Sequence, residues 1–159
     1  MLSVIIPTLN AEKSLARTLN CLIPAAVSGL VGDVSIVDGG STDKTEEIAD
    51  SAGADFISAP KGRGSQLSVG GAAATGDWLL FLHADTVLDP GWEDEVRKFM
   101  GFAQAGRFKS PDMAAAFKFA LDDFSLKARF LERMVALRCI LFGLPYGDQG
   151  LLISRAFYE

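Results

Sequence analysis

The chain has 159 residues, of which 49% are hydrophobic and 22% charged, and its formal net charge is −5. This length suits one domain, and the composition excludes a disordered chain because enough apolar surface is available for a core. The negative charge argues against nucleic acid as the main partner, since proteins that bind nucleic acids usually carry a basic surface. The two cysteines, Cys21 and Cys139, form no C-x-x-C pair, and we interpret both as apolar residues in a reducing compartment.

The ends of the chain suggest a location and a domain boundary. The start, MLSVIIPTLN, lacks the basic and apolar regions of a signal peptide, and no uncharged apolar run reaches the ~20 residues that cross a bilayer. We therefore expect a cytoplasmic protein. The end, LLISRAFYE, resembles the opening of another helix, so we expect a single domain over residues 1–159 that lacks its C-terminal part.

The first half of the chain alternates apolar runs with helical patterns. The apolar runs predict buried strands over residues 2–6, 33–38, 55–60 and 77–85. The helical patterns lie between them, over residues 10–25, 39–54 and 61–76. We expect Pro24 to end the first helix, Asp43 and Glu46 to form a capping box for the second, and Gly53 to close it.

This order of strands and helices predicts an α/β fold, a Rossmann-like three-layer α/β/α structure with a mainly parallel central sheet. Strands that alternate with helices pair in parallel through right-handed crossovers, which places helices on both faces. Ligands of such sheets bind at the carboxyl ends of the strands. Residues 7–10, 38–41 and 83–85 all follow strands, so we expect them to meet at one edge.

The second half is less regular. We expect a short helix over 89–100, a strand within 113–123, a helix over 124–144, and then a turn, a strand and a helix start. The 124–144 helix carries an apolar stripe of Leu126, Phe130, Met134, Leu137 and Leu141. We interpret this stripe as packed on the core, and a helix lying on a membrane surface is the alternative.

Asp38 ends a predicted strand and precedes Gly39 and Gly40. A carboxylate in this position can accept hydrogen bonds from a ribose hydroxyl pair or from a base N–H, and paired glycines let the backbone approach a ligand. The alternative is an acid that caps the next helix.

Lys61 and Arg63 are basic residues flanked by glycines at the start of a predicted helix. Side-chain charge and free backbone N–H groups at such a place suit a phosphate or diphosphate. A solvated loop is the alternative. The spacing matches neither a Walker loop nor the G-x-G-x-x-G pattern of dinucleotide enzymes.

His83 and Asp85 stand one residue apart at the tip of the fourth predicted strand. If the strand stays extended there, both side chains point the same way and Ala84 turns away. Imidazole and carboxylate ligands suit Mn²⁺ or Mg²⁺ bridging a diphosphate. The alternative is a packed histidine and an acid that caps a turn.

Asp148 lies between Gly147 and Gly150, where the chain can bend tightly and expose an acid. This carboxylate could serve as a general base for an attacking hydroxyl, with Gln149 orienting the acceptor or holding a diphosphate. A glycine turn without chemistry is the alternative.

Four segments in this order, SVIIPTLNAEKSLARTLNCL, VDGGSTDKT, GAAATGDWLLFLHADT and GDQG, resemble the family-two glycosyltransferases with a GT-A fold. The chain is most similar to a bacterial subgroup with H-A-D-T in place of the usual D-x-D and with a P-Y-G-D-Q segment. The resemblance covers nearly the whole chain. It departs from the family pattern at His83, which stands where the first acid of D-x-D is usual.

The resemblance implies an inverting glycosyltransferase that moves a sugar from a nucleotide-sugar donor to an acceptor hydroxyl with help from Mn²⁺ or Mg²⁺. It implies a metal at Asp85 and a catalytic base at Asp148. His83 either joins Asp85 as a metal ligand or forms a hydrogen bond to a phosphate or sugar. It implies a nucleotide site that contains Pro7, Thr8, Asn10, Glu12, Asp38, Gly39 and Gly40. The rest of the expected donor-binding set is Lys61, Arg63, His83, Ala84 and Gln149.

The expected partners are the nucleotide-sugar donor and an acceptor that the sequence does not identify, whether glycan, lipid or small molecule. Peripheral membrane contact and a homo-oligomer stay open. The main alternative function is a nucleotide-sugar-binding module without catalysis, which the missing first acid at His83 favours. A nucleotidyltransferase is less favoured, because PTLNAEK after the first strand lacks a glycine- and arginine-rich signature.

Overall fold

The computed structural model describes residues 1–106, 113–123, 125–142 and 150–159, and for 138–142 it describes the backbone alone. The strands are β1 (Leu2–Thr8), β2 (Val31–Asp38), β3 (Asp55–Ser58), β4 (Trp78–Phe81), β5 (Ala114–Ala116) and β6 (Leu151–Ser154). The helices are α1 (Leu15–Asn20), α2 (Ile23–Val27), α3 (Thr45–Ser51), α4 (Arg63–Ala73), α5 (Trp92–Gln104), α6 (Leu126–Phe142) and α7 (Arg155–Tyr158).

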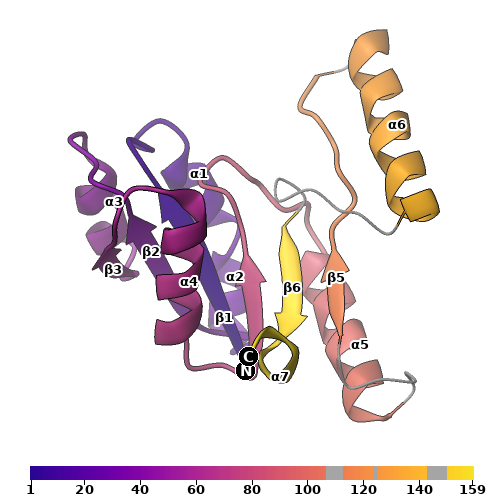
Figure 1. Cartoon of the computed structure of the whole chain (residues 1–159), viewed down its shortest axis with the longest axis horizontal. Coiled ribbons are helices and arrows are strands. Elements are labelled where there is room, and N and C mark those ends of the chain that lie inside the picture. The colour runs from indigo at the N-terminus through magenta and orange to yellow at the C-terminus, as the bar shows by residue number, and fades with distance from the viewer. Residues whose placement is uncertain (107–112, 124, 143–149) are drawn as a thin grey trace.

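The strands form one mixed sheet in the order β3-β2-β1-β4-β6-β5 (Figure 1). The four N-terminal strands run parallel, whereas β6 is antiparallel to both β4 and β5. The predicted mainly parallel α/β sheet is therefore confirmed. β1 lies in its middle and pairs with β2 as far as Thr8 opposite Asp38, so the carboxyl ends of these two strands are level.

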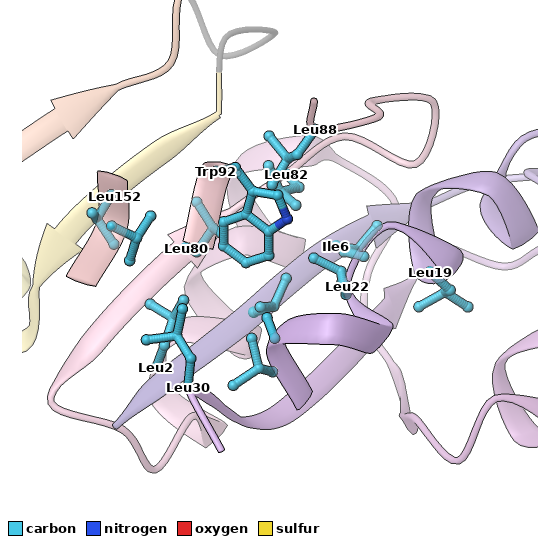
Figure 2. Close-up of a cluster of buried hydrophobic side chains, with 14 of the residues drawn as sticks. Leu2, Ile6, Leu19, Leu22, Leu30, Leu80, Leu82, Leu88, Trp92 and Leu152 are labelled. Carbon is cyan, nitrogen blue, oxygen red and sulfur yellow. The ribbon is translucent and has the colours of Figure 1, made fainter. Parts of the chain in front are cut away.

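Helices cover both faces of the sheet, and alternate residues of β1 supply both cores. Leu2, Val4 and Ile6 are fully buried in a cluster with α1, α2 and α5, where Trp92 packs near Leu80 and Leu82 (Figure 2). Ile5 is fully buried in a second cluster under α4. A strand that is covered on both faces needs apolar residues at consecutive positions, which explains the continuous apolar run of β1. Each fully buried Leu or Ile contributes about 1.5–3 kcal/mol to the free energy of folding.

α4 lies across β1 and β2 at close range because glycine faces the sheet (Figure 1). A Cβ at Gly70 would lie 2.4 Å from Ile5 Cγ2 and 2.8 Å from Val37 Cγ2. These distances are too short for any residue other than glycine at this position. At the C-terminal end of α4, the Arg155 guanidinium donates hydrogen bonds to the carbonyls of Ala74 and Gly76. The helix is thus held against the sheet at a fixed height.

Two predictions about helix ends are wrong. α1 ends at Asn20, and Pro24 lies in the first turn of α2, where a proline costs no helix hydrogen bond. Asp43 forms no capping box with Glu46. Its carboxylate instead accepts hydrogen bonds from Thr45 N and from the Thr45 hydroxyl. The prediction that Gly53 closes α3 is confirmed by its φ of 70°.

The prediction that the apolar stripe of α6 packs on the core is also wrong. Figure 1 shows α6 standing away from the sheet beyond β5. Leu126 is 89% exposed and Phe130 66% exposed, and Met134 and Leu137 are exposed as well. The side chain of Leu141 lies outside the described residues. Among the described residues, no helix combines the length and apolarity that crossing a membrane requires.

We predict that Gly70→Ala lowers the free energy of unfolding by about 1–3 kcal/mol, because the added methyl group forces α4 away from β1 and β2. Urea denaturation measures the change. The control is Gly101→Ala in α5, where a Cβ would meet no atom within 4 Å. This control should keep its stability or gain up to about 1 kcal/mol from better helix propensity. Equal stabilities of the two variants would contradict the close approach of α4.

Candidate functional site

The carboxyl ends of β2, β1 and β4 lie side by side, as the strand order requires. Asp38 ends β2, Thr8 ends β1, and residues 82–86 follow β4. Neighbouring strands are about 4.8 Å apart, so side chains from β2 and β4 are separated by about 10 Å across β1. The structure thus brings two of the three predicted segments into direct contact around Thr8 and places the third beside them.

The Asp38 carboxylate is the best-connected acid at this edge. Asp38 is 4% exposed. Its Oδ1 accepts hydrogen bonds from Thr8 Oγ1 at 2.9 Å and from Ser41 Oγ at 2.5 Å. Its Oδ2 accepts from Gly40 N at 2.8 Å and from Ser41 N at 2.7 Å. Asp38 does not cap the next helix, since α3 begins at Thr45 after Lys44, and it instead organises the glycine turn that follows β2.

These hydrogen bonds fix the charge state of Asp38. Burial alone would raise the pKa of this carboxyl, but the bonds from Ser41, Gly40 and Thr8 outweigh burial and hold the pKa below its ordinary value. The resulting stabilisation is fully present above the unfolded-state pKa of about 3.9. It is lost as the pH falls through the lower folded-state pKa.

The loop after β1 is bonded to the loop after β2. Asn10 N donates to Ser41 Oγ at 2.7 Å, and Thr42 N donates to Asn10 Oδ1 at 2.9 Å. Asn10 has a φ of 53°, a left-handed conformation that asparagine tolerates better than most residues. Asn10 is itself exposed, so the strained residue presents its side chain at the edge of the sheet.

Glu12 and Asp43 complete the link between these two loops. Glu12 N donates to Asp43 Oδ2 at 3.0 Å, and Lys44 N donates in return to Glu12 Oε2 at 3.3 Å. Behind them, Ala11 N donates to the buried Thr45 hydroxyl at 2.9 Å. The structure therefore brings Thr8, Asn10, Glu12 and Asp38 together, whereas Pro7 lies within β1 as a half-buried pair of Val37.

The H-A-D-T segment is a turn rather than the end of an extended strand. β4 ends at Phe81, and Thr86 N donates to His83 O at 3.1 Å. The alternation that was expected to align His83 with Asp85 therefore does not apply. Asp85 is exposed, whereas His83 and Ala84 are half-buried.

A side chain of α1 bonds to the backbone of this turn. The hydroxyl of Thr18, which is fully buried, donates to Ala84 O at 2.9 Å. Nearby, Trp92 Nε1 donates to Cys21 O at 3.2 Å. Sequence reasoning missed Thr18, although a threonine on the inner face of an apolar helix is a signal of a buried hydrogen bond.

Lys61 and Arg63 lie at the start of α4, after β3. Both side chains are exposed, and Gly62 between them has a φ of 144°, which favours glycine. The expected position at a helix N-terminus is thus confirmed. Sequence reasoning also missed Gln66 in the same helix, which is buried and bonded to both β1 and β2.

The described residues include an exposed carboxylate with the chemistry of a metal ligand. Among them, no three His, Cys, Asp or Glu side chains gather as a ligand set. The exposed Asp85 carboxylate, which makes no hydrogen bond or ion pair with any described residue, nevertheless has the oxygen chemistry that Mn²⁺ and Mg²⁺ prefer. Mg²⁺ commonly takes one or two carboxylates plus substrate phosphates and water, which this arrangement fits. Asp148 and Gln149 lie outside the described residues.

Relatives of known sequence match little more than half of the chain. Glucosyl-3-phosphoglycerate synthase of Mycolicibacterium smegmatis is 35% identical in an alignment of 97 residues that covers 55% of this chain and 31% of that protein. An uncharacterised glycosyltransferase of Rickettsia felis is 34% identical over 96 residues, which are 60% of this chain and 32% of that protein. The matched regions are thus about a third of each relative.

Solved structures match nearly the whole chain. The crystal structure of Mycobacterium tuberculosis glucosyl-3-phosphoglycerate synthase superposes with a TM-score of 0.68 at 25% identity, over 98% of this chain and 57% of that one. The complex of that enzyme with Mn²⁺, UDP and glucosyl-3-phosphoglycerate gives a TM-score of 0.67 at 24% identity. The chain therefore spans little more than half the length of these structures.

The family model named glycosyl transferase family 2 matches residues 3–134, which is most of the chain. This range includes the loops after β1 and β2, the start of α4 and the H-A-D-T turn. The chain belongs to the family 2 glycosyltransferases and has their GT-A fold.

Proposed function

We propose that the chain binds a nucleotide-sugar donor and belongs to an inverting glycosyltransferase that transfers the sugar to an acceptor hydroxyl with help from a divalent cation. The observation that carries this proposal is the pair of acids at one edge of the sheet. Asp38 is saturated with internal hydrogen bonds and orders a loop, whereas Asp85 lies exposed across β1. The solved relatives bind UDP and Mn²⁺ or Mg²⁺, which supports the same ligand class here.

The nucleoside half of the donor would lie over the loops after β1 and β2. A carboxylate has about four lone-pair positions, and four donors of the chain already bond to Asp38. A ribose hydroxyl or base N–H could bond to Asp38 only by displacing one of these donors, such as the Ser41 or Thr8 hydroxyl. The main contribution of Asp38 is therefore to hold Gly39 and Gly40, whose backbone can approach the ligand, beside Asn10 and Glu12.

The diphosphate half would lie toward Asp85 and His83, with Lys61 and Arg63 supplying positive charge. Asp85 would hold a divalent cation, which would supply positive charge for the leaving diphosphate. The turn at His83 and Ala84 is held by Thr18 of α1, so the Asp85 backbone is positioned before any ligand arrives. The two cations at the start of α4 and the helix N-terminus favour the developing negative charge.

The catalytic base in this proposal is Asp148, which would accept the proton of the acceptor hydroxyl as that oxygen attacks the sugar carbon. The sugar–phosphate bond breaks on the opposite side, and the nucleoside diphosphate leaves with its electron pair. A nucleotide-sugar-binding module without catalysis is the second candidate. His83 in place of an acid favours it, because one carboxylate holds a metal less tightly than two.

We predict that UDP raises the melting temperature and that Mn²⁺ increases this rise. At 100 times its Kd, UDP should add about 2.7 kcal/mol of stability, or about 5–10 °C. Asp85→Asn should abolish the Mn²⁺ effect and keep the effect of UDP alone, because only the metal carboxylate is lost. The control Asp89→Asn removes another exposed acid close by and should behave like the wild type. A full Mn²⁺ effect in Asp85→Asn would place the metal elsewhere.

We predict that Asp148→Asn slows turnover of a UDP-sugar by at least about a hundredfold, since a general base contributes about 10²–10⁴ in rate. The affinity for UDP should stay unchanged. Release of UDP with and without acceptor mixtures measures turnover, and calorimetry measures affinity. The matched control is Asp122→Asn, an exposed acid outside the proposed site. Donor binding without turnover in the wild type would favour the binding module.

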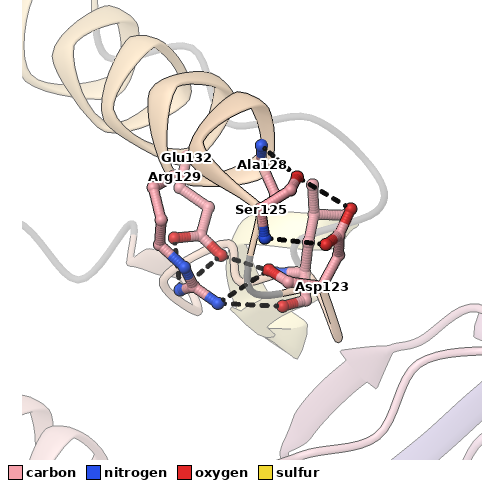
Figure 3. A network of polar contacts seen from close by, with 6 residues as sticks. Asp123, Ser125, Ala128, Arg129 and Glu132 are labelled. Carbon is pink, nitrogen blue, oxygen red and sulfur yellow. Dashed lines mark hydrogen bonds and ion pairs between the residues drawn. The ribbon is translucent and has the colours of Figure 1, made fainter.

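We also propose that the exposed face of α6 contacts an anionic membrane surface. A hydrogen-bond network at Asp123, Ser125, Arg129 and Glu132 turns the polar side of α6 toward the segment before it (Figure 3). The opposite side carries the exposed apolar stripe from Leu126 to Leu137. On a helical projection, Arg133 and Lys127 lie on the two flanks of this stripe. Cations beside an apolar stripe suit acidic headgroups.

We predict that the protein binds vesicles of phosphatidylglycerol and phosphatidylcholine and does not bind phosphatidylcholine alone. Phe130→Ser should weaken flotation with the anionic vesicles by about tenfold, because an aromatic side chain is no longer buried among the lipids. The control is Val27→Ser, because Val27 is 84% exposed but belongs to α2 and not to the apolar stripe of α6. If Phe130→Ser changes self-association instead of flotation, the stripe is the interface of a homo-oligomer.

A further inference from the structure

We propose that Gln66 is a positioning residue for the donor site, through which α4 holds the ends of β1 and β2 and the loop after β2. This inference rests on the proposed function for its consequence, but the structural role is independent of any ligand. Gln66 is 5% exposed, although it lies in a helix made largely of small and apolar residues. A buried amide in such a setting is retained only when its hydrogen bonds are made.

The side-chain amide of Gln66 joins two strands at the point where they end. Its Nε2 donates to Thr8 O at 2.7 Å and to Val37 O at 2.7 Å. Thr8 O also accepts from Gly39 N at 2.9 Å. Two carbonyl acceptors require a group with two N–H donors at one atom, which the glutamine amide supplies. The Gln66 amide is thus the anchor, in the sense that it fixes the Thr8 carbonyl to which Gly39 N of the glycine turn also bonds.

Two glycines make this anchor sterically feasible. Gly70, one turn further along α4, lets the helix approach β1 and β2 closely enough for the Gln66 side chain to reach their carbonyls. A Cβ at Gly39 would lie 3.2 Å from Gln66 Nε2, closer than ordinary contact, so the turn rests directly on the amide. Gly70 in the helix and Gly39 in the loop therefore both leave room for the hydrogen bonds of the Gln66 amide.

The anchor also sets the direction of Arg63. Residues three apart on an α-helix lie on the same face, and Arg63 is one turn before Gln66 toward the start of α4. Because Gln66 faces the strand ends, the rotation of α4 is fixed and Arg63 projects at the same edge of the sheet. Gln66 therefore couples the nucleoside loop, held by Asp38, to a cation proposed for the diphosphate.

The test compares Gln66→Met with Ser3→Ala. Methionine keeps the length of the side chain and removes both donors. Ser3 is a fully buried polar residue at the opposite end of β1, where its hydroxyl donates to Asp33 and accepts from Thr75 N and Gly76 N. Both variants lose buried hydrogen bonds at β1, at its two opposite ends, so both should melt at lower temperature. Only Gln66→Met should affect the donor site.

Two readouts are measured well below both melting temperatures. Amide hydrogen exchange of Gly39, Gly40 and Ser41 should accelerate in Gln66→Met and not in Ser3→Ala, because the turn has lost its support. UDP should bind Gln66→Met about tenfold more weakly, as expected if the unsupported turn holds its binding conformation about a tenth of the time. The ratio of UDP affinities with and without Mn²⁺ should stay at its wild-type value, since the turn at Asp85 is held by α1 instead.

A second variant keeps the test decisive if Gln66→Met does not fold. Gln66→Glu keeps the side-chain shape, and burial beside two carbonyls raises the pKa of the introduced carboxyl, which in its protonated form donates one hydrogen bond. Relative to wild type, its UDP affinity should therefore improve as the pH falls from about 8 to about 6.

Unchanged exchange at Gly39–Ser41 in Gln66→Met would overturn the proposal, as would wild-type UDP affinity or an equal loss of affinity in Ser3→Ala. A wild-type protein that binds no UDP would instead refute the proposed function. In that case the exchange data alone would still decide whether Gln66 orders the turn.

Discussion

The site depends on one buried carboxylate and on the donors that surround it. Taking a charge out of water is costly unless hydrogen bonds replace the lost hydration. Asp38 meets this condition with donors from β1, from the glycine turn and from Ser41. The turn after β2 cannot adopt another conformation without leaving this charge unsatisfied. The same requirement keeps β1 and β2 level at their ends, because Thr8 is one of the donors.

Three helices hold the loops around this carboxylate. α3 supplies Thr45, which bonds to the loop after β1, and α4 supplies Gln66, which bonds to the strands beneath the turn. α1 supplies Thr18, which bonds to the turn after β4. Each contact is a buried side chain of a regular element that bonds to the backbone of a loop or strand end. The loops are therefore ordered by the scaffold, which suits a site whose geometry must exist before the ligand binds.

The sequence predicted the strands and their parallel order because apolar β-branched runs and glycine turns are local signals. It also predicted which loops would meet, since strand order decides that. It failed where a contact between distant residues decides the structure. Gln66 and Thr18 have partners far away along the chain, so a local pattern can indicate that such a side chain is buried but not which residue it bonds to. The outward direction of the α6 stripe also could not be predicted, because periodicity shows that a stripe exists and not what covers it.

The H-A-D-T segment shows why the extended geometry predicted for His83 and Asp85 is wrong. An apolar run reaching Leu82 suggested a strand that continues to Asp85, but the antiparallel partner β6 pairs with β4 only between Trp78 and Phe81. On the other side, β1 continues to Thr8, but its pairing with β4 ends at Phe81 and the last backbone hydrogen bond is from Leu82 N to Ile5 O. The chain then closes a turn instead. The turn still exposes Asp85, because the buried Thr18 draws the Ala84 carbonyl inward.

The distribution of charge at this edge gives a physical reason for a cation in the proposed reaction. The chain is acidic overall, and a nucleoside diphosphate is an anion, so the edge must offset repulsion before it can bind one. Asp38 adds little repulsion, because its charge is spread over four internal hydrogen bonds. Asp85 has no such partner among the described residues. It is thus the acid at which a divalent cation would both satisfy the carboxylate and attract the diphosphate.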